Sequence, residues 1–81
     1  MGNPRPKPKR LAEKLLAIRQ RLGMSQSELA HLLNTKPYQR ISEYEIGRRE
    51  PSLMVLLRYA RSANVSVECL IDDEMDLPFE P

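Results

Sequence analysis

The sequence predicts one all-α domain, a compact bundle of five short helices. Apolar residues recur at intervals of three and four positions through most of the chain, the periodicity of helices that bury one face. Signals for helix starts and helix ends alternate with these apolar segments. The start signals are Ser25, Ser52 and Ser66, and the stop signals are Gly23, Asn34, Gly47 and Asn64. The length of 81 residues allows one modest core but no deep catalytic cleft with its own supporting shell.

The first helix is expected from Lys9 to Leu22. Its apolar face follows the spacing i, i+4, i+7 and i+11 and consists of Leu11, Leu15, Ile18 and Leu22. Residues 1–8, with three prolines, are expected to form a flexible basic arm. Two interpretations of this arm stay open. It lies along DNA phosphates or in a minor groove through Arg5, Lys7, Lys9 and Arg10, or it is a solvated tail.

Residues 22–34 carry the clearest local signals. Ser25 and Glu28 are spaced as a capping box, and Met24 and Leu29 as a hydrophobic staple. The apolar stripe of the second helix consists of Leu29, Leu32 and Leu33. Asn34 is expected to end this helix in a left-handed conformation.

A third helix is expected from Pro37 to Ile46. Thr35 or Lys36 would cap it, and Pro37 suits its first position, where a missing N–H costs nothing. Its inward face consists of Ile41 and Tyr44, and Gly47 ends it. Two helices of about nine residues joined by a four-residue turn form a helix-turn-helix pattern.

Two more helices are expected in the C-terminal part. Ser52 caps the fourth, whose apolar stripe consists of Leu53, Leu56, Leu57, Ala60 and Ala63. Ser66 caps the fifth, which turns Val67, Leu70 and Ile71 inward. Cys69 is expected as a small apolar side chain at or near an interface.

The charge is divided unevenly along the chain. Residues 1–61 hold all 13 Lys and Arg against five Glu, whereas residues 62–81 hold six acids and no base. A basic front and an acidic end imply separate partners. The tail, residues 72–81, intersperses its acids with Met75, Leu77 and Phe79. We expect either a frayed acidic extension or a segment whose apolar residues dock on a partner.

Several function classes are excluded by composition. No run of 18 apolar residues is present, so no membrane span is expected, and nothing resembles a signal peptide. One Cys and one His allow no disulfide, no structural zinc site and no Cys–His nucleophile. The carboxylates and hydroxyls form no acid–base set. We therefore expect a cytoplasmic protein that is not an enzyme and needs no cofactor or metal.

The stretch LGMSQSELA (22–30), followed by an isoleucine-centred helix and the pattern E-x-G-x-R-x-PSL (45–53), resembles the Cro/phage-repressor family of helix-turn-helix proteins. This family is also called the xenobiotic response element type. The resemblance covers roughly Leu11 to Ile71 and includes NVS at 64–66. It implies a compact five-helix, lambda-repressor-like DNA-binding domain over residues 9–71. Two departures are an extra residue at Lys36 and Ile46 at a position that is usually polar.

The predicted base-contacting residues lie on the outward face of the third helix. They are Tyr38, Gln39, Ser42 and Glu43. Gln39 suits a bidentate contact to adenine, and Glu43 suits the cytosine amino group. Each would be an ordinary solvated residue if it stood alone, and the motif around them favours the DNA contact. Because of the extra turn residue, either Gln39 with Glu43 or Tyr38 with Ser42 makes the main contacts.

The predicted phosphate contacts lie at helix ends and turns. They are Ser25, Gln26, Lys36, Arg40, Arg48 and Arg49. Two adjacent arginines on a turn offer forked donors that suit phosphate oxygens. Arg40 either crosses to the DNA backbone or covers the turn. The resemblance also places Arg19 against Glu45, a structural pair between the first and third helices.

The predicted function is sequence-specific binding of double-stranded DNA by a transcriptional regulator, a repressor. The alternative is an antitoxin-type interaction module that binds a partner protein through its acidic tail and represses its own operon. A homodimer is expected through the fourth and fifth helices and the tail, with recognition helices about 34 Å apart. Its predicted apolar contacts are Met54, Val55, Tyr59, Cys69, Met75, Leu77 and Phe79.

Overall fold

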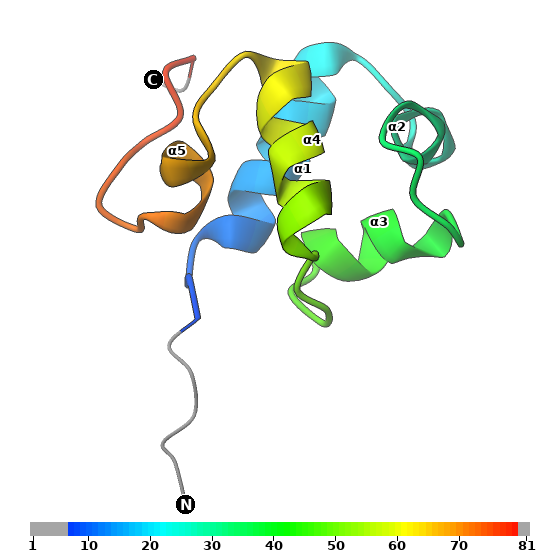
Figure 1. Cartoon of the computed structure of the whole chain (residues 1–81), viewed down its shortest axis with the longest axis horizontal. Coiled ribbons are helices and arrows are strands. Elements are labelled where there is room, and N and C mark those ends of the chain that lie inside the picture. Colours follow the sequence, from blue (N-terminus) through cyan, green and yellow to red (C-terminus); the bar gives the residue numbers. More distant parts are fainter. Residues whose placement is uncertain (1–6, 80–81) are drawn as a thin grey trace, which may run out of the picture.

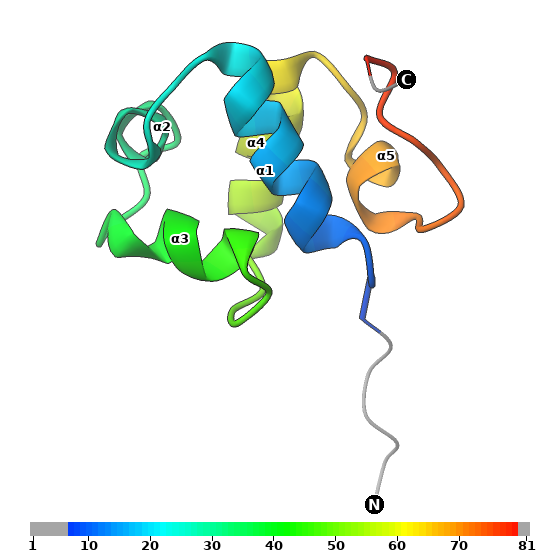
Figure 2. The ribbon, with the colours of Figure 1, turned by 180° about the vertical axis from the view of Figure 1, so that it is seen from behind.

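The computed structural model describes residues 7–79, in which five helices and no strand are present. They are α1 (Leu11–Leu22), α2 (Gln26–Leu32), α3 (Gln39–Glu45), α4 (Leu53–Ala63) and α5 (Val67–Ile71). α1 and α4 pack together in the centre, with α2 and α3 on one side and α5 on the other (Figure 1). The view from behind shows the same division (Figure 2). The predicted all-α architecture of five helices is confirmed.

One core joins all five helices. Its large, fully buried side chains are Leu15, Ile18, Leu29, Leu33, Ile41, Tyr59, Leu70 and Leu77. Tyr44 of α3 meets Tyr59 of α4 edge to face, with ring centroids 6.5 Å apart and an interplanar angle of 70°. Aromatic pairs favour this geometry because a positive ring edge meets a negative ring face. The contact holds the inner face of α3 on the core and leaves its other face outside.

The predicted start and stop signals operate as expected. Ser25, Ser52 and Ser66 each accept a hydrogen bond from the backbone N–H three residues later. The four stop residues have positive φ angles, between 52° at Asn34 and 78° at Gly47. Gly and Asn enter this left-handed region at the lowest cost, so they end helices efficiently.

Two helices are shorter than predicted. α1 begins at Leu11 rather than Lys9, and α3 covers Gln39–Glu45 rather than 37–46. The N–H groups of Arg40 and Ile41 bond to carbonyls three residues back, so the chain is wound more tightly than an α-helix between Pro37 and the first residues of α3. The connection between α2 and α3 is therefore residues 33–38, longer than the four residues expected.

The predicted cap of α3 is wrong. The Thr35 hydroxyl is buried and has no hydrogen-bond partner within residues 7–79. Lys36 is exposed and lies before the turn. Tyr38 occupies the N-cap position but makes no side-chain cap bond. The start of α3 is thus fixed by packing of Ile41 and Tyr44 rather than by a local cap.

Four apolar side chains lie on other faces than predicted. Leu32, Leu53 and Ile71 were expected inside but are 51%, 81% and 45% exposed. Tyr59, expected outside the stripe of α4, is fully buried. Leu53 and Tyr59 lie three residues on either side of Leu56, so helical spacing cannot distinguish them. Packing of the other helices decides which of the two is covered.

The segment 72–79 is not a frayed extension, because it packs on the domain. Leu77 is only 1% exposed, and Met75 and Phe79 pack against the core. The Arg21 guanidinium lies over the Phe79 ring, 5.2 Å from its centroid, a cation–π contact. The helices and this segment therefore share one core.

Lys14 of α1 anchors the same segment. Its side chain is fully buried, and Nζ donates to the carbonyls of Cys69, Asp72 and Met75 at 2.8, 2.9 and 2.7 Å. An ammonium has three N–H donors, so all of them are satisfied. A charge can be buried only when it is satisfied in this way.

Asp73 caps the start of α1 from the other end of the chain. Its carboxylate accepts the backbone N–H groups of Lys9 and Arg10, both at 2.9 Å, and these bonds lower the pKa of Asp73. Arg10 also binds Asp76 at 2.8 Å. We call these contacts of Arg10, Lys14, Asp73 and Asp76 the C-terminal clamp.

The clamp bears on the predicted basic arm. Arg10 is engaged with the C-terminal segment instead of being free for phosphates. Lys7 and Lys9 are exposed. Most of the arm, residues 1–6 with Arg5, lies outside the described residues.

Candidate nucleic-acid interface

The start of α2 is built by local bonds. Ser25 Oγ accepts the Glu28 N–H at 3.1 Å, and Glu28 Oε1 accepts the Ser25 N–H at 2.8 Å. This is the predicted capping box, and the bond from the Ser25 backbone is the main cause that lowers the pKa of Glu28. The Ser25 hydroxyl, predicted as a phosphate contact, thus already serves as the cap. Its oxygen also lies 3.3 Å from Ser27 Oγ.

Glu45 sits at the junction of three helices. Its carboxylate binds Arg19 at 2.7 Å (Oε2–Nε) and 3.2 Å (Oε1–Nη2), and its side chain is only 5% exposed. The expected structural pair is therefore present, and the bond to Glu45 raises the pKa of Arg19. Arg19 Nη1 also donates to the Met24 carbonyl at 2.9 Å. The pair fixes the end of α3 to α1 and to the residue before α2.

Gln26 belongs to the same junction, which the sequence did not indicate. Its Nε2 donates to Glu45 Oε1 at 3.0 Å. A primary amide has two N–H donors and one acceptor oxygen. One donor is therefore used inside the protein, and this bond holds the side-chain amide at the start of α2. The remaining donor is the group that suits a phosphate oxygen.

The outer face of α3 carries the predicted base-contacting residues. Tyr38 is 56% exposed and Gln39 is exposed, whereas Ser42 and Glu43 are partly buried. Ile41 and Tyr44 occupy the opposite, buried face. A helix that is fixed on one side and polar on the other can enter a major groove with its outer side chains.

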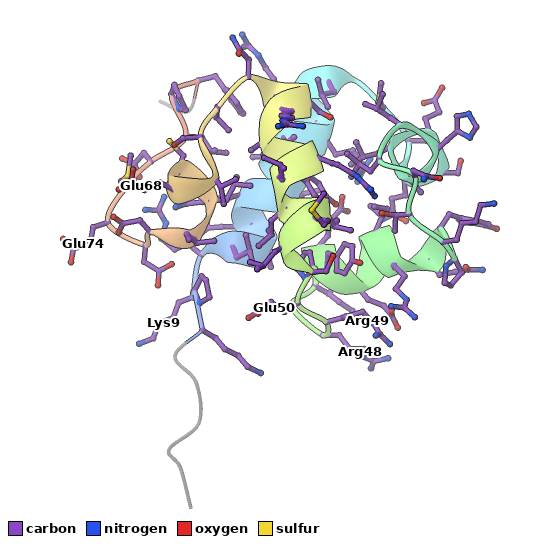
Figure 3. All side chains as sticks on the ribbon, in the orientation of Figure 1. Lys9, Arg48, Arg49, Glu50, Glu68 and Glu74 are labelled. Carbon is purple, nitrogen blue, oxygen red and sulfur yellow. The ribbon has the colours of Figure 1, made fainter. Side chains whose placement is uncertain are left out.

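Arg48 and Arg49 lie in the loop that follows α3. In Figure 3 they extend from this loop, well away from Glu68 and Glu74 beside α5 and the C-terminal segment. The backbone N–H groups of both arginines donate to the Glu43 carbonyl, at 2.9 and 3.3 Å. The loop is therefore fastened to the last turn of α3. The arginines of this loop therefore lie on a different part of the surface from the acidic C-terminal segment (Figure 3).

Arg49 forms an ion pair that the sequence did not predict. Its Nε lies 3.0 Å from Glu43 Oε1, and the two side chains are 46% and 32% exposed. Glu43 was expected to contact a base and Arg49 a phosphate. No residue-type signal marked this pair, because six positions and a helix end separate its members. The predicted base contact, Glu43, and the predicted phosphate contact, Arg49, are therefore bonded to each other.

One hollow beside α3 gathers three predicted phosphate contacts. Its volume is about 350 Å³, and Lys36, Arg40 and Arg49 all line it. Lys36 comes from the turn before α3, Arg40 from its first turn and Arg49 from the loop after it. Ser52, the cap of α4, lines the same hollow. Glu50 lines it as well, so the hollow has three cations and one carboxylate, an excess of positive charge that attracts a phosphate. Gln26 and Ser25 do not join this group.

Metal sites and membrane-spanning helices are absent from the part of the chain that the structure describes. Within residues 7–79, no cluster of three or more His, Cys, Asp or Glu side chains is arranged to hold a metal ion. None of the helices in this range has the length and apolar character needed to span a bilayer.

Comparisons with known proteins identify the family and the fold. A family model described as Helix-turn-helix (HTH_3) matches residues 15–68, from α1 to the second residue of α5. This range includes the predicted base and phosphate contacts from Ser25 to Arg49 but not the basic arm. A comparison with curated protein sequences finds no match.

Solved structures share the fold. The phage P22 c2 repressor, solved in complex with a synthetic operator, superposes with a TM-score of 0.71 at 24% identity, over 78% of this chain and 94% of that chain. The restriction-modification controller protein C.AhdI from Aeromonas hydrophila gives 0.66 at 26% identity, over 75% and 91%. A hypothetical transcription factor, NHTF, from Neisseria gives 0.67 at 24% identity, over 86% of both chains.

Proposed function

We propose that this chain, which belongs to the helix-turn-helix family, is a transcriptional repressor. It represses by occupying an operator as a symmetric dimer. DNA binding and transcription regulation follow from the family and its structural neighbours. Repression, the dimer and the individual contacts are the finer parts of the proposal. A protein with this function acts in the compartment that holds the DNA, the cytoplasm of a bacterial cell.

The observation that carries the proposal is the hollow beside α3. It collects Lys36, Arg40 and Arg49 at the edge of α3, whose inner face is buried on the core and whose outer face is polar. In the proposed complex, these three cations and Arg48 hold the DNA backbone, as does the second N–H of the Gln26 amide. Gln39 and Tyr38 reach the base edges from the start of α3. Ser42 and Glu43 lie further along the same face.

The proposed dimer uses a smaller surface than the sequence indicated. Tyr59, Cys69 and Leu77 are buried inside the chain and are not available to a partner. The apolar side chains that remain exposed in this part are Leu53, Met54 and Ile71. Leu53 and Ile71 line an open groove of about 400 Å³ whose floor includes Leu56. We propose that two copies meet at this groove, since a symmetric interface pairs one patch with itself.

The alternative function, an antitoxin that holds a partner protein by its tail, gains no support from the packing. Met75, Leu77 and Phe79 lie against the protein's own core. Removing residues 72–81 to test for a partner would also remove part of that core.

The test begins with selection of bound duplexes from a random DNA pool, followed by binding titrations over a range of salt. Arg48→Ala should weaken binding to every sequence alike and flatten the slope of log K against log salt by about one. Gln39→Ala should cost about 1–3 kcal/mol on the selected site and relax the preference at one position.

Arg61→Ala is the matched control for charge, because Arg61 is exposed in the last turn of α4, away from the loop after α3. It should leave both affinity and slope close to those of the unmodified protein. The proposal fails if no duplex is enriched. The assignment of Arg48 fails if its loss affects only one operator base. Light scattering and footprinting decide the dimer: a monomer that protects a single half-site would contradict it.

A further inference from the structure

We propose that Glu43 and Arg49 together determine DNA specificity. On unrelated DNA the Glu43 carboxylate stays paired with Arg49 and competes with DNA phosphates for it. On the cognate site a base takes the place of Arg49 as the partner of Glu43, and Arg49 binds a phosphate. This inference rests on the proposed function, since it concerns how the same surface distinguishes DNA sequences. The two residues come from different elements, α3 and the loop after it.

The geometry supports a contact that can exchange. Arg49 is bound through Nε at 3.0 Å, and both side chains are partly exposed rather than enclosed. An ion pair between partly exposed side chains is weak, so a phosphate can replace Glu43 as the partner of Arg49, or a base can replace Arg49 as the partner of Glu43, at small cost. By contrast, the Arg19–Glu45 pair has a carboxylate that is 5% exposed and also holds Gln26, so it is not free to exchange.

Because of the position of the pair, the exchange changes how strongly the protein attracts the DNA backbone. Arg49 lines the hollow shared with Lys36 and Arg40, where a phosphate would lie. While Glu43 is paired with it, one of these three positive charges is offset by a carboxylate on the DNA-facing side. On unrelated DNA the carboxylate finds no donor, stays on Arg49 and reduces attraction to the backbone.

A cytosine at the right position changes this balance. Its amino group donates a hydrogen bond to a carboxylate in the major groove. Glu43 then turns from Arg49 to the base, and Arg49 becomes free for the phosphate. One base contact and one phosphate contact are therefore gained together. The backbone bonds from Arg48 and Arg49 to the Glu43 carbonyl keep the two side chains in register during the exchange.

The experiment compares Glu43→Gln with the unmodified protein on two duplexes of equal length, the selected site and an unrelated sequence. On unrelated DNA, Glu43→Gln should bind about threefold to tenfold more tightly and steepen the salt slope by about one, because one more cation is released to a phosphate. The ratio of affinities for the two duplexes should fall about tenfold with the loss of the cytosine contact.

Glu74→Gln is the matched control. It removes the same charge from an exposed residue in the C-terminal segment, far from Arg49 in Figure 3, and should change neither quantity. Arg49→Ala provides the second background. In that background Glu43→Gln should lose most of its effect on unrelated DNA, because the Arg49 guanidinium, for which Glu43 and the phosphates compete, is absent.

Two results would overturn the proposal. The first is equal weakening of both duplexes by Glu43→Gln, which would make Glu43 a support for Arg49. The second is an undiminished gain in the Arg49→Ala background, which would make Glu43 a simple repulsive charge. Failure of the proposed function is distinguishable from both, because the unmodified protein would then bind the two duplexes equally or not at all.

Discussion

The helix-turn-helix segment and the C-terminal clamp lie on opposite sides of α1 and α4 and are held together by different kinds of contact (Figures 1 and 2). In the first, the capping box joins residues three positions apart, Ser25 and Glu28. In the second, the bonded residues lie far apart in sequence: Lys14 and Cys69 are 55 positions apart, and Arg10 and Asp76 are 66.

The difference shows which part of the fold can vary independently. The start of α2 forms from its own neighbours, and α3 is held on the core by its inner face, so the exposed residues of both helices are free to suit a DNA sequence. The clamp joins the C-terminal segment to α1 and to the two residues before it. α1 links the two regions, since Lys14 serves the clamp and Arg19, five residues later, holds α3 through Glu45.

The largest expected effect breaks the clamp. Lys14→Met keeps the apolar stem but removes the three donors, leaving three carbonyls without their partner. We expect a loss of about 4 kcal/mol in the free energy of unfolding, measured by urea titration. Lys9→Met makes the same change at an exposed side chain and should be nearly neutral. Equal stability of both variants would show that the clamp does not stabilise the fold.

The next effect separates α3 from α1 without touching the clamp. Arg19→Met leaves the buried Glu45 carboxylate unpaired and should cost about 3 kcal/mol, as should Glu45→Gln. The double variant should cost less than the sum of the two, because neither charge is then left alone. Equal urea midpoints for all four proteins would contradict a structural role for this pair.

A smaller effect tests how local the helix-turn-helix segment is. Ser25→Ala removes the side-chain cap of α2 and should cost about 1 kcal/mol. Hydrogen exchange should locate the loss in the first turn of α2 and leave the amides of α5 unchanged. Equal loss of protection across the domain would mean that this segment is no more independent than the clamp.

The smallest expected effect concerns Asp73 of the clamp and depends on pH. The pKa of Asp73 is lowered in the folded protein, chiefly by the backbone N–H groups of Lys9 and Arg10. Its stabilising contribution is therefore present above the unfolded pKa of about 4 and is lost as the pH falls through the lower folded value. The difference in unfolding free energy between the unmodified protein and Asp73→Asn should shrink between neutral and strongly acidic pH. A difference that stays constant over this range would contradict the assignment.

The sequence by itself determined the number of helices, the caps Ser25, Ser52 and Ser66 and the four stop residues, but not where α1 and α3 begin or how long the connection between α2 and α3 is. It also indicated which face of α3 is polar. Each of these features depends on residues within one or two helical turns, such as Ser25 with Glu28 or Ile41 with Tyr44. The Arg19–Glu45 pair was also expected, but only because the motif resembles a known family.

The tertiary structure alone decided which side of α4 is covered and what the C-terminal segment does. Leu53 and Tyr59 are equally spaced from Leu56, so only the neighbouring helices separate them. The Glu43–Arg49 contact joins α3 to the loop after it, and the Gln26–Glu45 contact joins α2 to α3. Both depend on how the connections between these elements orient the chain. The contacts of Lys14 could not be predicted from the residue types, because its acceptors are backbone carbonyls, which every residue carries.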